Sequence, residues 1–179
     1  MPDKFSSGKV VFTIRNADPG DATAVRSLRL EALSLHPEAF AADLEMTAAE
    51  AADVWAERIA GYAAINSGAI YIALVGDILV GMSGIGRGHW PKTQHFSTIW
   101  GVYVNQDWRG QHIAGQLLNG CIEWAEKNGI SVINLGVNIS NIPAIRSYAR
   151  SGFTVYGVEP RAIFYNGNYY DELLMVKLL

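Results

Sequence analysis

The chain has 179 residues, half of them hydrophobic, which is enough to bury a sizeable core within the usual size of one domain. Its 14 Lys and Arg against 17 Asp and Glu give a net charge of −3 with no basic run, which argues against nucleic acid as a direct partner. Cys121 is the sole cysteine, no apolar stretch is long enough to span a membrane, and no signal segment is evident, so we expect one cytoplasmic domain over residues 1–179.

The first third of the chain predicts one strand and two helices. Residues 9–15 alternate apolar and polar side chains, as a strand does. A helix begins after Asp18, which suits an N-cap, with Pro19 in its first turn, and it ends near His36. Its apolar residues are Val25, Leu28, Leu33 and Leu35. The capping-box spacing of Thr47 and Glu50 predicts a second helix that runs to about residue 64.

The rest of the chain alternates strands with helices. Strands are predicted at 69–75, 78–85, 97–104, 132–137, 154–158 and 169–178, the first two forming a hairpin through Gly76-Asp77. Helices are predicted after residue 112 and at 141–150. The first of these carries Ile113, Leu117, Cys121 and Trp124 or Ala125 on one face, which makes Cys121 a small core residue rather than a nucleophile.

The most informative segment runs from the strand at 97–104 through a turn into the next helix. Small residues at 110, 114 and 115 let the backbone approach a ligand, and the first N–H groups of the helix lack intrahelical partners. Arg109 adds a forked cation suited to phosphate oxygens. The segment has neither the glycine spacing of a dinucleotide fold nor the Gly-Lys-Ser/Thr end of an NTPase loop.

The run Arg109-Gly110-Gln111-His112-Ile113-Ala114 resembles the pyrophosphate-binding signature Arg/Gln-x-x-Gly-x-Gly/Ala of the GNAT superfamily of acyl-CoA-dependent N-acetyltransferases. His112 stands where that pattern has a glycine. Its side chain must therefore point away from the pyrophosphate if the amide at this position is still to bind it.

A second block, Asn141-Ile142-Pro143-Ala144 through Tyr148 to Gly152-Phe153, is similar to the family's Asn-x-x-Ala-x-x-x-Tyr-x-x-x-Gly-Phe pattern. The resemblance implies that Asn141 contacts the cofactor arm and that the Tyr148 hydroxyl lies near the thioester sulfur. Considered alone, Asn141 is a helix N-cap, with Pro143 in the first turn. Considered alone, Tyr148 is more typical of core packing.

The resemblance implies an α/β fold (α+β in some schemes) with a mixed, mostly antiparallel sheet of about seven strands, splayed between the fourth and fifth strands and flanked by four helices. Unpaired backbone at the splay would pair with pantetheine, because buried N–H and C=O groups need partners. The implied co-substrate is acetyl-CoA, with no metal. The residues expected to hold it are Val102, Tyr103, Val104, Arg109, Gly110, Gln111, His112, Ile113, Ala114, Gly115 and Asn141.

The implied chemistry is direct attack of a neutral primary amine on the thioester, with Tyr148 as the acid for the leaving thiolate. Many relatives carry a Glu as base on the fourth strand, but residues 97–103 contain no carboxylate. The candidates left open are Glu38, His89 or His95, Asp171 or Glu172, and a water chain.

The acceptor pocket is expected, by resemblance, between the first two helices and the last hairpin, with Glu38, Phe40, Trp90 and Tyr169 as its residues and Trp55 and Tyr165 as further aromatic candidates. The weak net charge favours a small amine over a basic protein tail. Three functions remain open: a small-molecule N-acetyltransferase, a protein N-terminal or lysine acetyltransferase, and a non-catalytic acyl-CoA sensor. Dimers are frequent in proteins of this kind, so a homodimer is compatible with the sequence.

Overall fold

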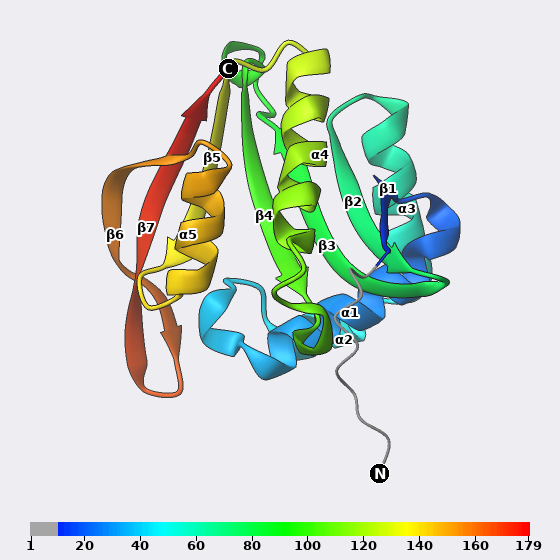
Figure 1. Cartoon of the computed structure of the whole chain (residues 1–179), viewed down its shortest axis with the longest axis horizontal. Coiled ribbons are helices and arrows are strands. Elements are labelled where there is room, and N and C mark those ends of the chain that lie inside the picture. The colour runs from blue at the N-terminus through cyan, green and yellow to red at the C-terminus, as the bar shows by residue number, and fades with distance from the viewer. Residues whose placement is uncertain (1–10) are drawn as a thin grey trace.

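The computed structural model describes residues 11–179, and its main feature is a seven-stranded sheet in the order β1-β2-β3-β4-β5-β7-β6 (Figure 1). Every neighbouring pair of strands is antiparallel except β4 and β5. The strands are Thr13–Asn16 (β1), Gly68–Val75 (β2), Ile78–Arg87 (β3), Phe96–Val104 (β4), Val132–Asn138 (β5), Thr154–Tyr165 (β6) and Asn168–Leu178 (β7). Lys9 and Val10, expected in the first strand, lie outside the described residues.

Helices cover both faces of this sheet. They are Ala22–Leu35 (α1), Leu44–Ala49 (α2), Ala52–Ala64 (α3), Ile113–Lys127 (α4) and Ile142–Arg150 (α5). Neighbouring residues of β2 belong to different cores, because side chains alternate along a strand. Ile70 packs with α1 and α3, whereas Ala69 packs with α4 and α5. The predicted fold class, a mixed and mostly antiparallel sheet between two helical layers, is confirmed.

The sheet opens between β4 and β5. The two strands pair in parallel only from Phe96 to Thr98, opposite residues 132–134. A β-bulge follows in β4, where Gly101 and Val102 together oppose Ser83 of β3. Gly101 has a φ of +64°, which a residue with a side chain adopts only at a cost. The bulge bends β4 away from β5, as Figure 1 shows, and the predicted splay is confirmed.

The helical segment begins after Asp18 and ends before His36 as predicted, but its first turn, Pro19–Asp21, is a 3-10 helix and α1 itself starts at Ala22. The Asp18 carboxylate accepts a hydrogen bond from Gly20 N at 2.8 Å, and the Asp21 carboxylate accepts one from Asp18 N at 2.8 Å. Val25, Leu28 and Leu33 are buried as expected, but Leu35 is 51% exposed because it lies at the last position of the helix. Arg29 is buried although it is charged, and the apolar pattern of the helix does not predict this burial.

The helix predicted from Thr47 to residue 64 is two helices, so the sheet is flanked by five helices rather than four. Thr47 is not the cap. Asp43 caps α2 by accepting from Met46 N at 2.8 Å, and the Thr47 hydroxyl donates back to Asp43 O at 2.7 Å. Glu50 is extended, with ψ at 128°, and ends this short helix. Side chains that bond to nearby backbone favour such breaks.

Strand β6 extends beyond the predicted 154–158, through Pro160, to Tyr165. It is the outermost strand of the sheet, so the missing N–H of a proline costs no ladder bond. The register shifts between Glu159 and Ile163, with Arg161 at a φ of +56°. Within residues 11–179, none of the helices has both the length and the hydrophobicity that crossing a membrane requires.

Candidate active site

The opening between β4 and β5 contains a cavity of about 890 Å³. It is bordered by β4, by the turn and first residues of α4, by α5, and by the segment that follows α1. The expected residues that line it are Glu38, Phe40, Val102, Tyr103, Val104, Arg109, Gly110, His112, Ile113, Ala114, Gly115, Asn141 and Tyr148. Gln111 is exposed in the same turn but is not part of the lining.

The first turn of α4 presents backbone N–H groups to this cavity. His112 is the N-cap and its side chain forms no capping hydrogen bond. The first intrahelical donor is Gln116 N, which reaches His112 O at 3.2 Å. The amides of Ile113, Ala114 and Gly115 therefore have no helical partner and lie at the positive end of a 15-residue helix. Such an end suits a pyrophosphate.

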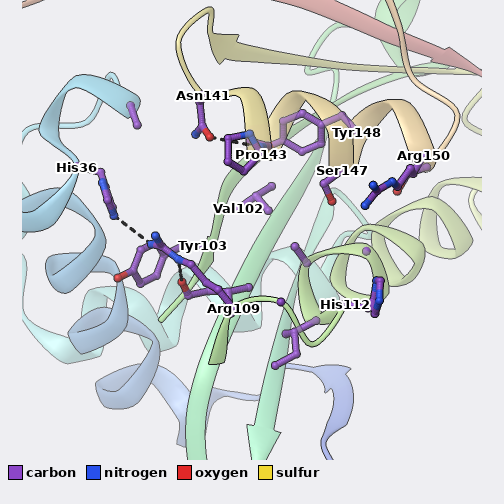
Figure 2. A pocket seen from close by; sticks show the side chains of 18 of the residues that line it. His36, Val102, Tyr103, Arg109, His112, Asn141, Pro143, Ser147, Tyr148 and Arg150 are labelled. Atoms are coloured by element: carbon purple, nitrogen blue, oxygen red, sulfur yellow. Dashed lines mark hydrogen bonds between the residues drawn. The ribbon is translucent and has the colours of Figure 1, made fainter. Parts of the chain in front are cut away.

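His112 adopts left-handed backbone geometry, with φ at 62° and ψ at 14°. This conformation explains why the family pattern has a glycine at this place. The His112 side chain is exposed, and Figure 2 shows it at the outer end of the cavity. Gly110 also has a positive φ, of 80°, and a Cβ placed there would meet no protein atom within 4 Å. The requirement for glycine at 110 is thus conformational rather than a matter of crowding by protein atoms.

Arg109 is already engaged by its own chain. Its Nε donates to Val104 O at 3.0 Å, and its Nη2 donates to Nε2 of His36 at 3.0 Å (Figure 2). The guanidinium also lies 5.6 Å from the centre of the Tyr103 ring. Arg109 thereby links the turn before α4 to the segment after α1, with its charge at the cavity wall.

Asn141, which directly precedes α5, and Tyr148 of α5 border the cavity on the side opposite Arg109 (Figure 2). Asn141 is the N-cap predicted from the sequence, since its Oδ1 accepts from Ala144 N at 3.2 Å. Tyr148 is 7% exposed and packs edge-on against Phe153. Burial, and to a lesser degree the nearby Glu172 carboxylate, raises the pKa of Tyr148. Its phenol is therefore protonated at neutral pH.

A hydrogen bond crosses the opening. The buried Asn138, at the end of β5, donates from Nδ2 to Glu38 O at 3.1 Å, while its Oδ1 accepts from N and Oγ of Ser140. The segment after α1 is thus fastened to β5, and Glu38 is held half-buried at the cavity wall.

The five candidate bases lie in different places. His89 and His95 flank the β3–β4 connection, at the end of the sheet where β4 and β5 are still paired, and neither lines the cavity. Asp171 accepts from Arg161 N at 2.7 Å. Glu172 is half-buried on β7 opposite Asn138, and burial together with Glu159 raises its pKa. Of these five candidates, Glu38 alone lines the cavity, and Glu172 lies on β7 opposite Asn138, which also lines it.

Two expected acceptor-site residues lie outside the cavity lining. Trp90 is 70% exposed beside His89, because the β3–β4 connection lies at the wrong end of the sheet. Tyr169 is 59% exposed and packs on Phe164 within the β6–β7 hairpin. Lining residues that the sequence did not single out include Trp108, Gln116, Asn119, Asn138, Ser140, Ser147 and Arg150. Helical spacing from Pro143 could have indicated Ser147, four residues later, and Arg150, three residues after that.

Cys121 is fully buried, and burial raises the pKa of its thiol to about 12, which confirms it as a core residue. Its Sγ lies 3.3 Å from Ser83 Oγ. Among residues 11–179, no group of three or more His, Cys, Asp or Glu side chains is placed to hold a metal ion.

A splayed β4–β5 pair that ends at unpartnered helix amides is the geometry implied by the sequence resemblance, and the family model for the acetyltransferase (GNAT) family matches residues 30–153. The chain belongs to that family. It is an acetyl-CoA-dependent acetyltransferase. The L-amino acid N-acetyltransferase AaaT of Escherichia coli is 27% identical over 169 residues, which cover 93% of this chain and 98% of that protein. Mycothiol acetyltransferase of Brachybacterium faecium is 30% identical over 140 residues, 76% of this chain and 39% of that protein.

Solved structures share the fold of this acetyltransferase. A GNAT-family acetyltransferase from Streptococcus pneumoniae superposes with a TM-score of 0.85 at 22% identity, covering 94% of this chain and 100% of the other. The yncA protein of Salmonella typhimurium, solved with its cofactor acetyl-CoA, has a TM-score of 0.83 at 22% identity, covering 94% of each chain. At this identity the likeness establishes the fold alone.

Proposed function

We propose that the protein transfers the acetyl group of acetyl-CoA to the primary amine of a small molecule, by direct attack within a ternary complex. The observation that carries this proposal is the opening between β4 and β5, which ends at the free amides of α4. The relative from Escherichia coli, named for L-amino acid acetylation, spans nearly the full chain and supports a small acceptor.

The cofactor would lie along β4 and end at α4. Beyond Thr98, β4 has no strand partner on the β5 side, so the backbone from Val102 to Val104 is available to the amide groups of pantetheine. The pyrophosphate would accept hydrogen bonds from the first amides of α4 and lie beside the charge of Arg109. The proposed cofactor contacts are Val102, Tyr103, Val104, Arg109, Gly110, Gln111, His112, Ile113, Ala114, Gly115 and Asn141.

The acceptor amine must lose a proton before or during attack, because an alkyl ammonium with a pKa of about 10.4 is mostly charged at pH 7. We assign this proton to Glu172, directly or through a water. Its raised pKa makes it a stronger base than an ordinary glutamate, and it lies opposite Asn138 at the end of β5. Glu38 is the alternative, because it borders the cavity.

Attack forms the C–N bond and breaks the C–S bond, so negative charge develops on the sulfur. Tyr148 would donate a hydrogen bond from its phenol to that sulfur. Because the pKa of Tyr148 is raised well above that of a thiol, the phenol stabilises the thiolate chiefly as a hydrogen-bond donor and remains protonated afterwards.

The test is an amine-panel assay that measures thiol release from acetyl-CoA, with product mass confirmed for each hit. Small amines should give release that depends on the amine. Two results would contradict the proposal: turnover restricted to peptide N-termini or lysines, or tight CoA binding without turnover of any amine. The first would identify a protein acetyltransferase and the second an acyl-CoA sensor.

A further inference from the structure

A second pocket lies on the α1–α3 side of β4. It has a volume of about 300 Å³, which is at the lower end for small-ligand sites. Its walls combine two arginines and one glutamate with aromatic rings: Arg29, Ala42, Thr47, Glu50, Trp55, Arg58, Tyr62 and Trp100. Trp55, an aromatic candidate for the acceptor pocket, thus lines this second pocket and not the cofactor cavity.

Two donors in this pocket are buried without partners. Arg29 is 7% exposed, and its Nη1 has no hydrogen-bond partner among residues 11–179. The indole Nε1 of Trp55, a residue 2% exposed, also has none within that part of the chain. Leaving one buried donor unpaired costs roughly 1–3 kcal/mol, and more when it is charged. Both atoms are closed off from solvent, so they do not face the open part of the pocket, and what Arg29 offers a ligand there is its charge.

The charge balance of the pocket identifies the ligand as an anion. Arg58 pairs with Glu50 at 3.0 Å and lies 4.5 Å from the centre of the Trp55 ring. Arg29 packs over the Phe40 ring at 4.5 Å and takes part in no salt bridge of the described chain. Burial and the neighbouring Arg58 lower the pKa of Arg29 to about 10, so it is still a cation at neutral pH. The described residues leave that one charge uncompensated.

The pocket adjoins the reaction site. Phe40 lines the cofactor cavity on one side and carries Arg29 on the other. Nη1 of Arg29 lies 3.5 Å from where a Cβ of Gly101 would stand, and Gly101 directly precedes Val102 at the cavity wall. An anionic group held by Arg29 would therefore lie beside Gly101, the residue before the cavity-lining Val102.

We propose that this pocket binds the carboxylate of the acceptor through Arg29 and Arg58, and that the acceptor is a free α-amino acid. The inference rests on the proposed function, which it narrows from primary amines to amines with a carboxylate on the same carbon. A planar guanidinium matches the two oxygens of a carboxylate. The rings of Tyr62 and Trp100 offer an apolar wall for the side chain of the amino acid.

The first experiment compares L-amino acids with their decarboxylated amines and methyl esters, for example phenylalanine, phenethylamine and phenylalanine methyl ester. A charge-assisted hydrogen bond corresponds to a factor of about 10–100, so kcat/KM for the free acid should exceed that for the amine and the ester by about that factor. Equal kcat/KM for acid, ester and amine, or a preference for peptides with a blocked carboxylate, would overturn the inference and leave the proposed function intact.

The second experiment uses Arg29→Met, which keeps the length of the side chain and removes the charge. It should raise the KM for the amino acid about 10- to 100-fold and leave the KM for acetyl-CoA unchanged. Arg87→Met is the matched control, because Arg87 also packs over an aromatic ring, that of Trp124, but lies at the end of β3 opposite Ser97, where it donates to Asn128 O and lines neither pocket. It should keep the wild-type preference for the free acid.

Two further measurements keep the outcomes separate. If Arg29→Met does not fold, the more accessible Arg58→Met serves instead, and an unchanged preference for the free acid in that variant would overturn the inference. If wild-type protein turns over no amine at all, the proposed function fails. Calorimetric titration of phenylalanine and of phenethylamine into the CoA-bound protein then decides the pocket by itself, since only the free acid should bind.

Discussion

The two sides of β4 are built from different parts of the chain. On the cofactor side, the ligand-facing groups are mostly main chain: the unpaired backbone after Thr98 and the amides of Ile113, Ala114 and Gly115. On the acceptor side they are side chains from separate elements, Arg29 of α1, Trp55 and Arg58 of α3 and Trp100 of β4. A main-chain site is sensitive to backbone conformation and tolerant of side-chain changes, whereas the opposite holds for a side-chain site.

The largest effect on kcat is expected at Tyr148. On the cofactor side, where main-chain groups predominate, its side chain is proposed to take part in the chemistry. Tyr148→Phe removes the proposed donor to the sulfur and keeps the packing against Phe153, so kcat should fall about 10²- to 10³-fold. The affinity for acetyl-CoA, measured by calorimetry, should stay unchanged. A kcat within a factor of about two of wild type across the pH range would remove Tyr148 from the mechanism.

The next largest effect is expected at Glu172. Glu172→Gln should lower kcat about 10²-fold and remove the acid limb of its pH profile. Because the base must be deprotonated, kcat of wild type should rise with pH, and the raised pKa of Glu172 places that rise above the range of an ordinary glutamate. Glu38→Gln is the comparison variant. If the limb disappears there and persists in Glu172→Gln, Glu38 is the base instead.

A moderate effect is expected where backbone conformation matters most on the cofactor side. Gly110→Val places a β-branched residue at a φ of 80°, which should cost about 1–2 kcal/mol and weaken acetyl-CoA binding about tenfold. Gln106→Ala, at an exposed position in the turn before α4 that neither lines the cavity nor is a proposed cofactor contact, should bind like wild type. Unchanged affinity in Gly110→Val would place the pyrophosphate elsewhere.

The smallest effect is expected at His112. His112→Gly relieves a left-handed conformation and should raise the free energy of unfolding by about 1 kcal/mol, measured by urea denaturation. Binding of acetyl-CoA should stay the same or improve slightly, since the amide and not the imidazole is proposed to face the pyrophosphate. A large loss of affinity would show that the imidazole itself contacts the cofactor.

The same contrast explains what the sequence could predict. Main-chain geometry depends on local residues, so it can be predicted from contiguous sequence motifs. Examples are the glycine at 110, the cap at Asn141 and the apolar strand that ends at Val104. The acceptor side has no such motif. Arg29 occupies a core position of an apolar helix face, and only the tertiary packing leaves its Nη1 without a partner.

The errors have a similar cause. Thr47 has the spacing of a capping box, but Asp43 caps the helix through Met46 N, and Thr47 donates back to Asp43 O. Trp90 precedes β4 in the chain, and only the direction of that strand places its loop at the end of the sheet where β4 and β5 are paired. The strand predicted at 154–158 continues to Tyr165, because β6 is the outermost strand and tolerates Pro160. The last two depend on contacts that are distant in sequence.

The bulge at Gly101 links the two compartments through a single residue without a side chain. In the chain, the bulge lies between Trp100, which lines the second pocket, and Val102, which lines the cofactor cavity. It also brings the backbone at Gly101 beside the guanidinium of Arg29. If the second pocket holds the acceptor as proposed, exchanging side chains at 29, 55, 58 or 62 should change acceptor choice while the thioester site stays constant. Specificity and catalysis would then be separable, and engineered changes of acceptor should begin at that pocket.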